Sequence, residues 1–129
     1  MNCLLIDDDL DDQEIFCLAL LEVNPDITCM LAKDGREGLE KLKLLNGPVH
    51  DYIFIDLNMP RMNGIETLQE INKMNFLNNT NIIIYSTTSN QTIIDDAISK
   101  GADGFLVKPG SLKELVHRLR ETFGHQTTK

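Results

Sequence analysis

Residues 51–68 read DYIFIDLNMPRMNGIETL, and this stretch shows the strand, loop and helix pattern on which the predicted fold rests. The apolar run Tyr52–Ile55 has the length of a strand and no polar alternation, as expected for a strand buried on both faces. It ends on Asp56, and Pro60 prevents an early helix. The Asn63–Gly64 pair indicates a turn into the helix that follows. The stretch therefore predicts a buried strand, a defined loop and a helix, with a carboxylate where the strand ends.

The same alternation of short apolar runs and longer helical patterns extends in both directions along the chain. Four further runs are short enough to be strands: Cys3–Ile6, Ile27–Ala32, Ile82–Tyr85 and Gly104–Val107. A segment with helical periodicity follows each of the runs. Strict alternation of strands and helices predicts an α/β domain, with a parallel sheet, right-handed crossovers and helices on both faces.

Capping residues and apolar spacing predict where helices start and which face they bury. A polar residue with glutamate three positions later predicts a capping box at three starts: Asp34 with Glu37, Asn63 with Glu66, and Ser111 with Glu114. Apolar spacing predicts the inner faces of the first, fourth and last helices, in turn: Ile15, Leu18 and Ala19; Ile94, Ala97, Ile98 and Gly101; Leu112, Leu115, Val116, Leu119 and Phe123.

Length and composition restrict the class of protein. A chain of 129 residues, 42% hydrophobic and 25% charged, suits one compact domain, expected over residues 1–123 with a short polar tail at 124–129. A formal net charge of −8 argues against binding to nucleic acid or to an anionic membrane, because both need a basic surface. No membrane-spanning apolar stretch occurs, and the three cysteines form no CxxC pair, so a reducing, cytoplasmic location is expected.

Polar side chains that could do chemistry stand where the predicted strands end. In open parallel sheets, function collects at the carboxyl ends of the strands. There the sequence places Asp7–Asp9, Asp56, Ser86–Thr88, and Lys108 followed by Pro109. The second strand ends in Ala32 and Lys33, which offer no obvious group for such a site.

The carboxylates of Asp7, Asp8 and Asp56 would repel one another unless protons or a cation neutralised them. A hard divalent ion held by carboxylates, a backbone carbonyl and water is typical of Mg²⁺. The sequence therefore predicts a Mg²⁺ site, with a solvated acidic helix start as the alternative. The other acidic residues of the run are interpreted as solvated first-turn charges: Asp9, Asp11 and Asp12.

Asp56 also has the chemistry of a nucleophile, because a carboxylate can form an aspartyl phosphate. Such a transfer depends mainly on neutralising the charge of the phosphoryl oxygens. Mg²⁺ would neutralise part of that charge and the Lys108 ammonium more, while a hydroxyl at the end of the fourth strand would donate a hydrogen bond. A lysine or a hydroxyl at a strand end is ordinarily solvated or part of a turn. Their combination at successive strand ends favours phosphoryl transfer.

Four motifs in register resemble the response regulator receiver domain of two-component signalling. They are LLIDDD at 4–9, FIDLNMPRMNG at 54–64, IIIYSTT at 82–88 and GADGFLVKP at 101–109. Their order and spacing agree over essentially the whole chain. The resemblance implies a flavodoxin-like, doubly wound fold of five helices and a five-stranded parallel sheet in the order 2-1-3-4-5. That order would put the second strand at the edge.

The resemblance implies a role for each residue of the phosphoryl-transfer site. Asp56 matches the phosphoacceptor, and Lys108 matches the lysine that binds the phosphoryl group. Asp8 matches the direct acidic metal ligand and Asp7 its partner, which often acts through water. The backbone carbonyl of Asn58 would complete the Mg²⁺ shell.

The resemblance also implies a conformational switch. Ser86 matches the switch hydroxyl, and Thr87 stands beside it as the alternative position. Phe105 matches the aromatic switch residue, which is frequently tyrosine in relatives, so no signal through a hydroxyl is expected at this position. The Lys108–Pro109 bond is often cis in the family.

The favoured function is a binding switch. A histidine kinase would phosphorylate Asp56, and the surface formed by the fourth helix, fifth strand and fifth helix would then bind or release an unknown downstream protein. A phosphate relay or sink without an output is the alternative, because it would use the same site. A Mg²⁺-dependent phosphohydrolase is disfavoured, because Asp7–Asp11 lacks the threonine of a DxDxT motif and the chain is too short for a cap domain. The chain is expected to be regulatory rather than an enzyme.

Overall fold

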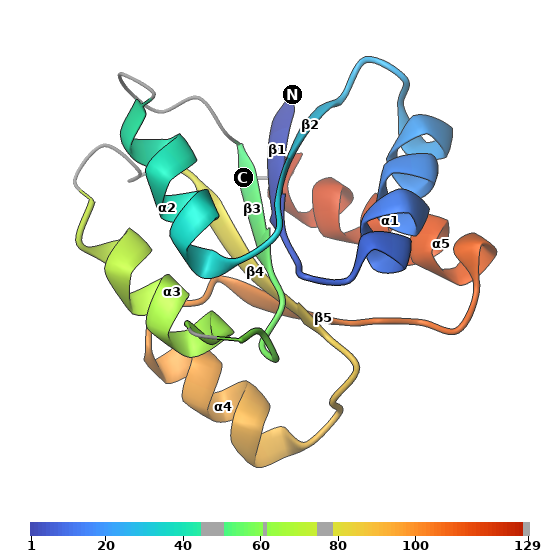
Figure 1. The fold of residues 1–129 in the computed structure, drawn as a ribbon. Coiled ribbons are helices and arrows are strands. Elements are labelled where there is room, and N and C mark those ends of the chain that lie inside the picture. The colour runs from blue at the N-terminus through green and yellow to red at the C-terminus, as the bar shows by residue number, and fades with distance from the viewer. Residues whose placement is uncertain (45–50, 61, 75–78, 128–129) are drawn as a thin grey trace.

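The computed structural model describes residues 1–44, 51–60, 62–74 and 79–127, in which five strands and five helices alternate as predicted (Figure 1). The strands are β1 (Asn2–Ile6), β2 (Thr28–Ala32), β3 (Tyr52–Ile55), β4 (Asn81–Ser86) and β5 (Gly104–Val107). The helices are α1 (Leu10–Val23), α2 (Gly35–Leu44), α3 (Gly64–Asn72), α4 (Gln91–Ser99) and α5 (Leu112–Thr127).

All five strands are parallel and lie in the order β2-β1-β3-β4-β5, which confirms the predicted flavodoxin-like topology. Leu5 of β1 pairs with Phe54 of β3, which pairs in turn with Ile83 of β4. β1, β3 and β4 are almost wholly buried, whereas β2 lies at the edge. Because parallel strands end at the same side of a sheet, this order brings the residues after β1, β3, β4 and β5 together.

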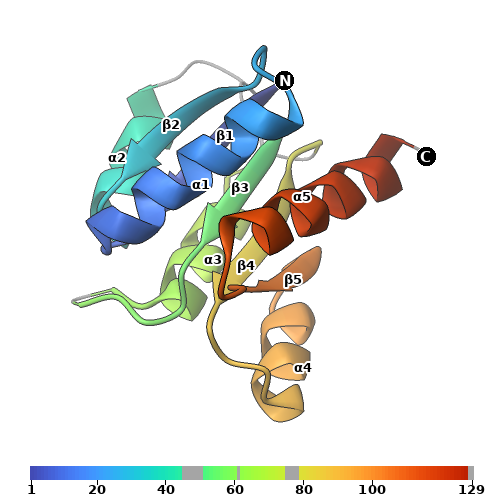
Figure 2. The ribbon, with the colours of Figure 1, turned by 90° about the vertical axis from the view of Figure 1, so that its right-hand side faces the viewer.

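Helices cover both faces of the sheet: α1 and α5 pack on one, and α2, α3 and α4 on the other (Figure 2). The face under α1 and α5 is aromatic. Phe16 of α1 meets Phe54 edge-to-face with ring centroids 4.9 Å apart, and Phe123 of α5 meets Tyr52 at 4.8 Å. Such pairs contribute roughly 0.5–1.5 kcal/mol beyond the area they bury. The rings thereby fix how α1 and α5 lie on the sheet.

The predicted inner face of α1 is wrong for two of its three residues. Ala19 is buried, but Ile15 and Leu18 are 42% and 46% exposed. Phe16 and Leu20 are buried instead. Apolar residues occur on several sides of this helix, so spacing alone does not determine the packed face. Phe16 is the largest fully buried side chain of this helix and packs on Phe54 of the sheet, so it determines the packed face.

The predicted inner face is only partly buried in α4 and is largely confirmed in α5. In α4, Ala97 is buried as predicted, but Ile94 is half-buried and Ile98 is exposed. The α4 helix therefore rests on the sheet through a narrow contact. In α5 the spacing is confirmed by four buried residues, Leu115, Val116, Leu119 and Phe123, while Leu112 in the first turn is exposed. The helix continues to Thr127, into the stretch predicted as a polar tail, and residues 128–129 lie outside the described residues.

The loop after β3 is held by a complete capping box and a close approach of the backbone. The Asn63 side chain accepts from the Glu66 N–H at 2.9 Å, and the Glu66 carboxylate accepts from the Asn63 N–H at 3.1 Å. A Cβ at position 64 would lie 2.4 Å from the Asp56 carbonyl oxygen, so glycine is needed there. The start of α3 is consequently held close to the backbone of Asp56.

The other two predicted capping boxes are only half formed. Ser111 Oγ accepts from the Glu114 N–H at 3.2 Å, and Asp34 accepts from the Glu37 N–H at 2.8 Å. The Glu37 carboxylate accepts from the Lys33 N–H and therefore does not close the box.

The described chain has no cis peptide bond, so the Lys108–Pro109 bond is trans.

Candidate phosphoryl-acceptor and metal site

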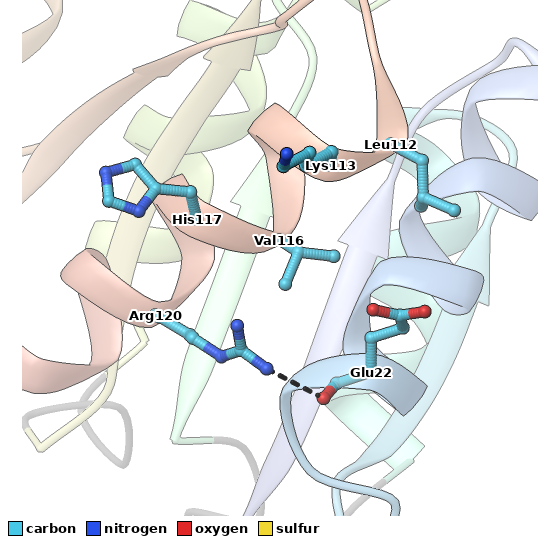
Figure 3. Close-up of a pocket in the computed structure, with 6 residues that line it drawn as sticks. All are labelled: Glu22, Leu112, Lys113, Val116, His117 and Arg120. Atoms are coloured by element: carbon cyan, nitrogen blue, oxygen red, sulfur yellow. Dashed lines mark hydrogen bonds between the residues drawn. The ribbon is translucent and has the colours of Figure 1, made fainter.

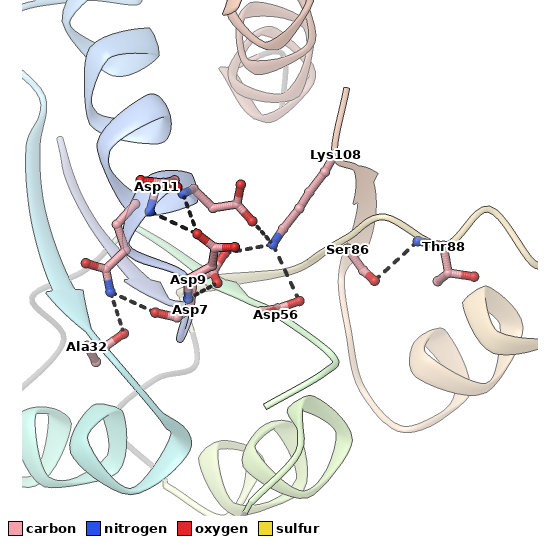
Figure 4. Close-up of polar contacts among 10 residues, drawn as sticks. Asp7, Asp9, Asp11, Ala32, Asp56, Ser86, Thr88 and Lys108 are labelled. Carbon is pink, nitrogen blue, oxygen red and sulfur yellow. Dashed lines mark hydrogen bonds and ion pairs between the residues drawn. The ribbon is translucent and has the colours of Figure 1, made fainter. Parts of the chain in front are cut away.

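The side chains that follow β1, β3 and β5 meet at one edge of the sheet around Lys108 (Figure 4). The Lys108 Nζ donates to Asp7 Oδ2 at 2.9 Å and to Asp12 Oδ2 at 2.7 Å, and lies 3.7 Å from Asp56 Oδ1. Burial opposes the charged form of Lys108, yet the hydrogen bonds to Asp12 and Asp7 raise the pKa of its ammonium above the usual range. Lys108 is therefore a permanent positive charge among these carboxylates.

Asp56 is only 6% exposed, at the end of β3. Burial raises the pKa of Asp56 to about 7, with Lys108 acting against this rise and the negative charge of Asp7 adding to it. The Asn58 backbone N–H donates to the Asp56 carboxylate and favours its charged form. A carboxylate so poor in solvation gains from any cation placed beside it.

Asp7 is fully buried at the end of β1. Burial raises the pKa of Asp7 above its usual range, opposed by the Asp9 N–H, which Asp7 Oδ1 accepts at 3.0 Å, and by Lys108. Its backbone carbonyl accepts from Gln13 Nε2 at 2.7 Å, and the same amide lies 3.4 Å from the Ala32 carbonyl. Gln13 therefore ties the ends of β1 and β2 to α1, a role for which its polar side chain gave no sequence signal.

Asp7, Asp8 and Asp56 each offer a carboxylate oxygen within 4.8 Å of the others. Asp7 and Asp56 are buried, and Asp8 is exposed. Three hard oxygen donors with net negative charge, one of them open to solvent, fit a small divalent cation that keeps part of its water shell. The residues present therefore fit the Mg²⁺ ion that the sequence predicts.

Asp9 and Asp11 are exposed, as the sequence predicted, whereas Asp12 is not the solvated charge that it suggested. The Asp9 side chain is the N-cap of α1, accepting from the N–H groups of Asp11 and Asp12 at 2.9 and 3.2 Å. Asp12 lies on Lys108, as described above, with its side chain 32% exposed. No local pattern could reveal the Asp12 contact, because its partner lies 96 positions further along the chain.

The hydroxyls at the end of β4 differ in burial. Ser86 is fully buried, and its Oγ accepts from the Thr88 N–H at 3.4 Å (Figure 4). Thr87 is exposed. Ser86 is thus the hydroxyl of the two that the fold turns inward. Phe105, the predicted switch aromatic, is half-buried and packs against the core under α2, α3 and α4.

Away from this cluster, a pocket lies between α1 and α5 (Figure 3). At one side of the pocket, the Arg120 guanidinium donates to the Glu22 carbonyl at 3.2 Å. Its lining residues are Glu22, Leu112, Lys113, Val116, His117 and Arg120. None of them belongs to the strand-end cluster. This pocket is therefore separate from the candidate site.

Comparison with known proteins places the chain in one family. The family described as response regulator receiver domain matches residues 3–120. The chemotaxis protein CheY of Thermotoga maritima is 38% identical over 90 residues, which cover 70% of this chain and 71% of that protein. The nitrate/nitrite response regulator protein NarL of Escherichia coli K12 is 33% identical over 103 residues, covering 79% of this chain but 45% of NarL. The chain thus spans about half the length of that regulator.

Solved structures agree with this placement. The chemotaxis protein CheY4 of Vibrio cholerae superposes with a TM-score of 0.79 at 27% identity, over 93% of this chain and 96% of that one. A receiver domain from Rhodospirillum rubrum reaches a TM-score of 0.85 over the whole chain and 95% of its own, at 20% identity, which bears on the fold alone. The chain belongs to the response regulator receiver domain family of two-component systems.

Proposed function

We propose that this protein is a phosphorylation-dependent signalling switch in which a histidine kinase transfers a phosphoryl group to Asp56. The observation that carries the proposal is the position of the buried Asp56 carboxylate. It lies 3.7 Å from the Lys108 ammonium and within 4.8 Å of the Asp7 and Asp8 oxygens. A nucleophile beside a fixed cation and a cation-binding pair is the arrangement that phosphoryl transfer needs.

The residues divide the work of the transfer. A carboxylate oxygen of Asp56 forms a bond to phosphorus while the bond from phosphorus to the kinase's histidine nitrogen breaks, and that nitrogen keeps the electron pair. Lys108 binds a phosphoryl oxygen. Mg²⁺, held by Asp7, Asp8 and Asp56 with the Asn58 carbonyl, would neutralise charge on the carboxylates and the phosphoryl oxygens. Receiver domains are regulatory phosphoacceptors, so the product here is a changed surface rather than a released molecule.

The changed surface is proposed to be the one formed by α4, β5 and α5. Phosphorylation would draw the Ser86 hydroxyl toward Asp56, and the half-buried Phe105 ring would turn into the space vacated. The α4 helix contacts the sheet narrowly and exposes Ile93 and Ile98, and both features support the proposal that it shifts and then binds a partner.

No helix among the described residues is long and apolar enough to cross a membrane.

The energies involved are compatible with such a switch. Moving a two-state equilibrium from 1:99 to 99:1 needs about 5.5 kcal/mol of differential stabilisation. Charge-assisted hydrogen bonds from Ser86 and Lys108 to a phosphoryl group, at roughly 1.5–3 kcal/mol each, supply a large part of it. Phosphorylation would therefore supply much of the free energy needed to shift the Phe105 equilibrium.

Amide chemical-shift mapping tests the switch. Beryllofluoride mimics the phosphoryl group, so adding it to the Mg²⁺-bound protein should shift the amides around Asp8, Asp56 and Ser86, and also Phe105 and α4. An Asp56→Asn variant under the same conditions should show none of these changes. If the wild-type shifts stay near the site while Phe105 and α4 remain silent, the proposed output surface is wrong.

A pair of variants tests the metal ligands. Asp8→Ala removes an exposed carboxylate of the cluster and should weaken Mg²⁺ binding by more than about tenfold. Asp11→Ala removes the same charge from a nearby exposed position, and should change the Mg²⁺ dissociation constant by less than about threefold, through screened electrostatics only. Titration calorimetry of the two variants against wild type measures both. An equal loss of Mg²⁺ affinity in both variants would mean that Asp8 attracts the ion only through its charge and is not a ligand.

A further inference from the structure

The Lys108 ammonium is already committed to acceptors on the β1 and α1 side of the site. An ammonium has three N–H donors. Asp12 accepts at 2.7 Å and Asp7 at 2.9 Å, whereas Asp56 Oδ1, at 3.7 Å, is beyond hydrogen-bond distance. The phosphate-binding cation is therefore held closer to two other carboxylates than to the residue whose phosphoryl group it would bind.

The position of Asp12 is fixed rather than incidental. The Asp9 cap accepts from the N–H groups of both Asp11 and Asp12, which orders the first turn of α1. On the opposite side, the Lys108 N–H donates to the Ser86 carbonyl at 2.7 Å. Both ends of the Asp12–Lys108 pair are thus anchored by backbone hydrogen bonds, which lowers the entropic cost of holding the two side chains together.

We propose that Asp12 is a positioning residue, which holds the Lys108 ammonium on the α1 side and thereby weakens its binding to a phosphoryl group on Asp56. The proposal rests on the function proposed above. A phosphoryl group attached to Asp56 brings acceptor oxygens that compete with Asp12 for the same N–H groups. The Asp12 contact stabilises the unphosphorylated form and has to be given up, in whole or in part, when the phosphoryl group is bound.

Removal of the Asp12 charge should therefore favour the phosphorylated form. In Asp12→Asn, Lys108 loses its nearest charged acceptor and is free to turn toward Asp56. At saturating Mg²⁺, the variant should bind beryllofluoride roughly two- to fivefold more tightly than wild type, the range expected for one partly exposed charged contact. Asp12→Glu, which retains the charge, should return the dissociation constant toward the wild-type value.

The matched control is Asp11→Asn, which removes the same charge from the same turn of α1 at an exposed side chain. General electrostatics would affect both variants alike, whereas the proposed contact affects only Asp12. The Lys108 side-chain ¹⁵N ammonium resonance of the metal-free protein is a second readout. Asp12→Asn should shift it or broaden it through faster hydrogen exchange, and Asp11→Asn should leave it in place.

The outcomes separate this proposal from the one on which it rests. If wild type binds no beryllofluoride, the proposed function fails, and the role of Asp12 fails with it. If wild type binds it and Asp12→Asn binds equally, more weakly, or only as tightly as Asp11→Asn, the role of Asp12 alone is overturned. Tighter binding in Asp12→Asn only, with a perturbed Lys108 resonance, supports it.

Discussion

Asp56→Asn should abolish phosphorylation of the protein by acetyl phosphate. Wild type, incubated with acetyl phosphate and Mg²⁺, should gain the mass of one phosphoryl group, and the variant should gain none. The substitution keeps the shape of a buried side chain, so the variant is expected to fold. It removes the anionic oxygen that attacks phosphorus in the proposed transfer. Intact-mass spectrometry measures the difference directly.

The control for this result is Asp51→Asn, which changes an exposed aspartate that precedes β3 and accepts from the Asn2 N–H at 2.8 Å. The Asp51→Asn variant should gain one phosphoryl group to the same extent as wild type. If Asp56→Asn still gains a phosphoryl group to the wild-type extent, the acceptor is another residue and the proposed site is wrong. Partial labelling of the variant would place a second acceptor within the cluster.

Lys108→Ala should strongly destabilise the metal-free protein at neutral pH. Removing one partner of a buried ion pair costs about 3–5 kcal/mol, because the other charge is left uncompensated. Here the Lys108 side chain is 9% exposed, and its loss leaves Asp7 and Asp56 buried without a cation. We expect a loss of about 2–4 kcal/mol in the free energy of unfolding at pH 7.5, since some repulsion is relieved by protonation. Urea denaturation in the presence of a chelator measures it.

The pH dependence of this loss has a definite sign. Burial raises the pKa of Asp56 to about 7, and raises that of Asp7, so the folded state holds protons that the unfolded state releases above about pH 4. Stability from these groups therefore falls as pH rises through that window. Removing Lys108 raises both pKa values further, so the variant should lose most at pH 7.5 and least near pH 5.

Two controls make the Lys108 result specific. Lys100→Ala removes an exposed lysine paired with Asp96 on α4, and should change stability by less than about 1 kcal/mol. Saturating Mg²⁺ should recover part of the loss in Lys108→Ala, since a bound cation compensates the same carboxylates. A Lys108→Ala protein as stable as wild type at pH 7.5 would contradict the assignment of Lys108 as the charge that balances the cluster.

The sequence by itself determined the order of the elements. Runs such as Tyr52–Ile55 and Ile82–Tyr85 are apolar and β-branched over strand length, and each precedes a segment with helical spacing, so local propensity and global fold agree. The same agreement placed Asp7, Asp56 and Lys108 at strand ends, and parallel pairing then brings strand ends together. Strand order itself came from the resemblance to a family, because local pattern does not specify which strands are neighbours.

The tertiary structure alone decided which faces of the helices are buried where apolar residues surround the helix axis. In α1, the packing of Phe16 on Phe54 turned Ile15 and Leu18 outward. In α4, Ala97 is buried against the sheet, whereas the neighbouring Ile98 is exposed. Spacing gives the period of a helix but not its rotation, which depends on the fit of side chains from distant segments.

The side-chain contacts within the site also could not be predicted from the sequence. Asp12 and Gln13 read as ordinary residues of an acidic helix start, yet one accepts from Lys108 and the other donates to the Asp7 carbonyl. A side-chain hydrogen bond depends on how the fold positions two segments of backbone in space, and Asp12 and Lys108 are 96 positions apart in the sequence. The sequence therefore determined which chemical groups reach the edge of the sheet, and the tertiary structure determined which of them touch.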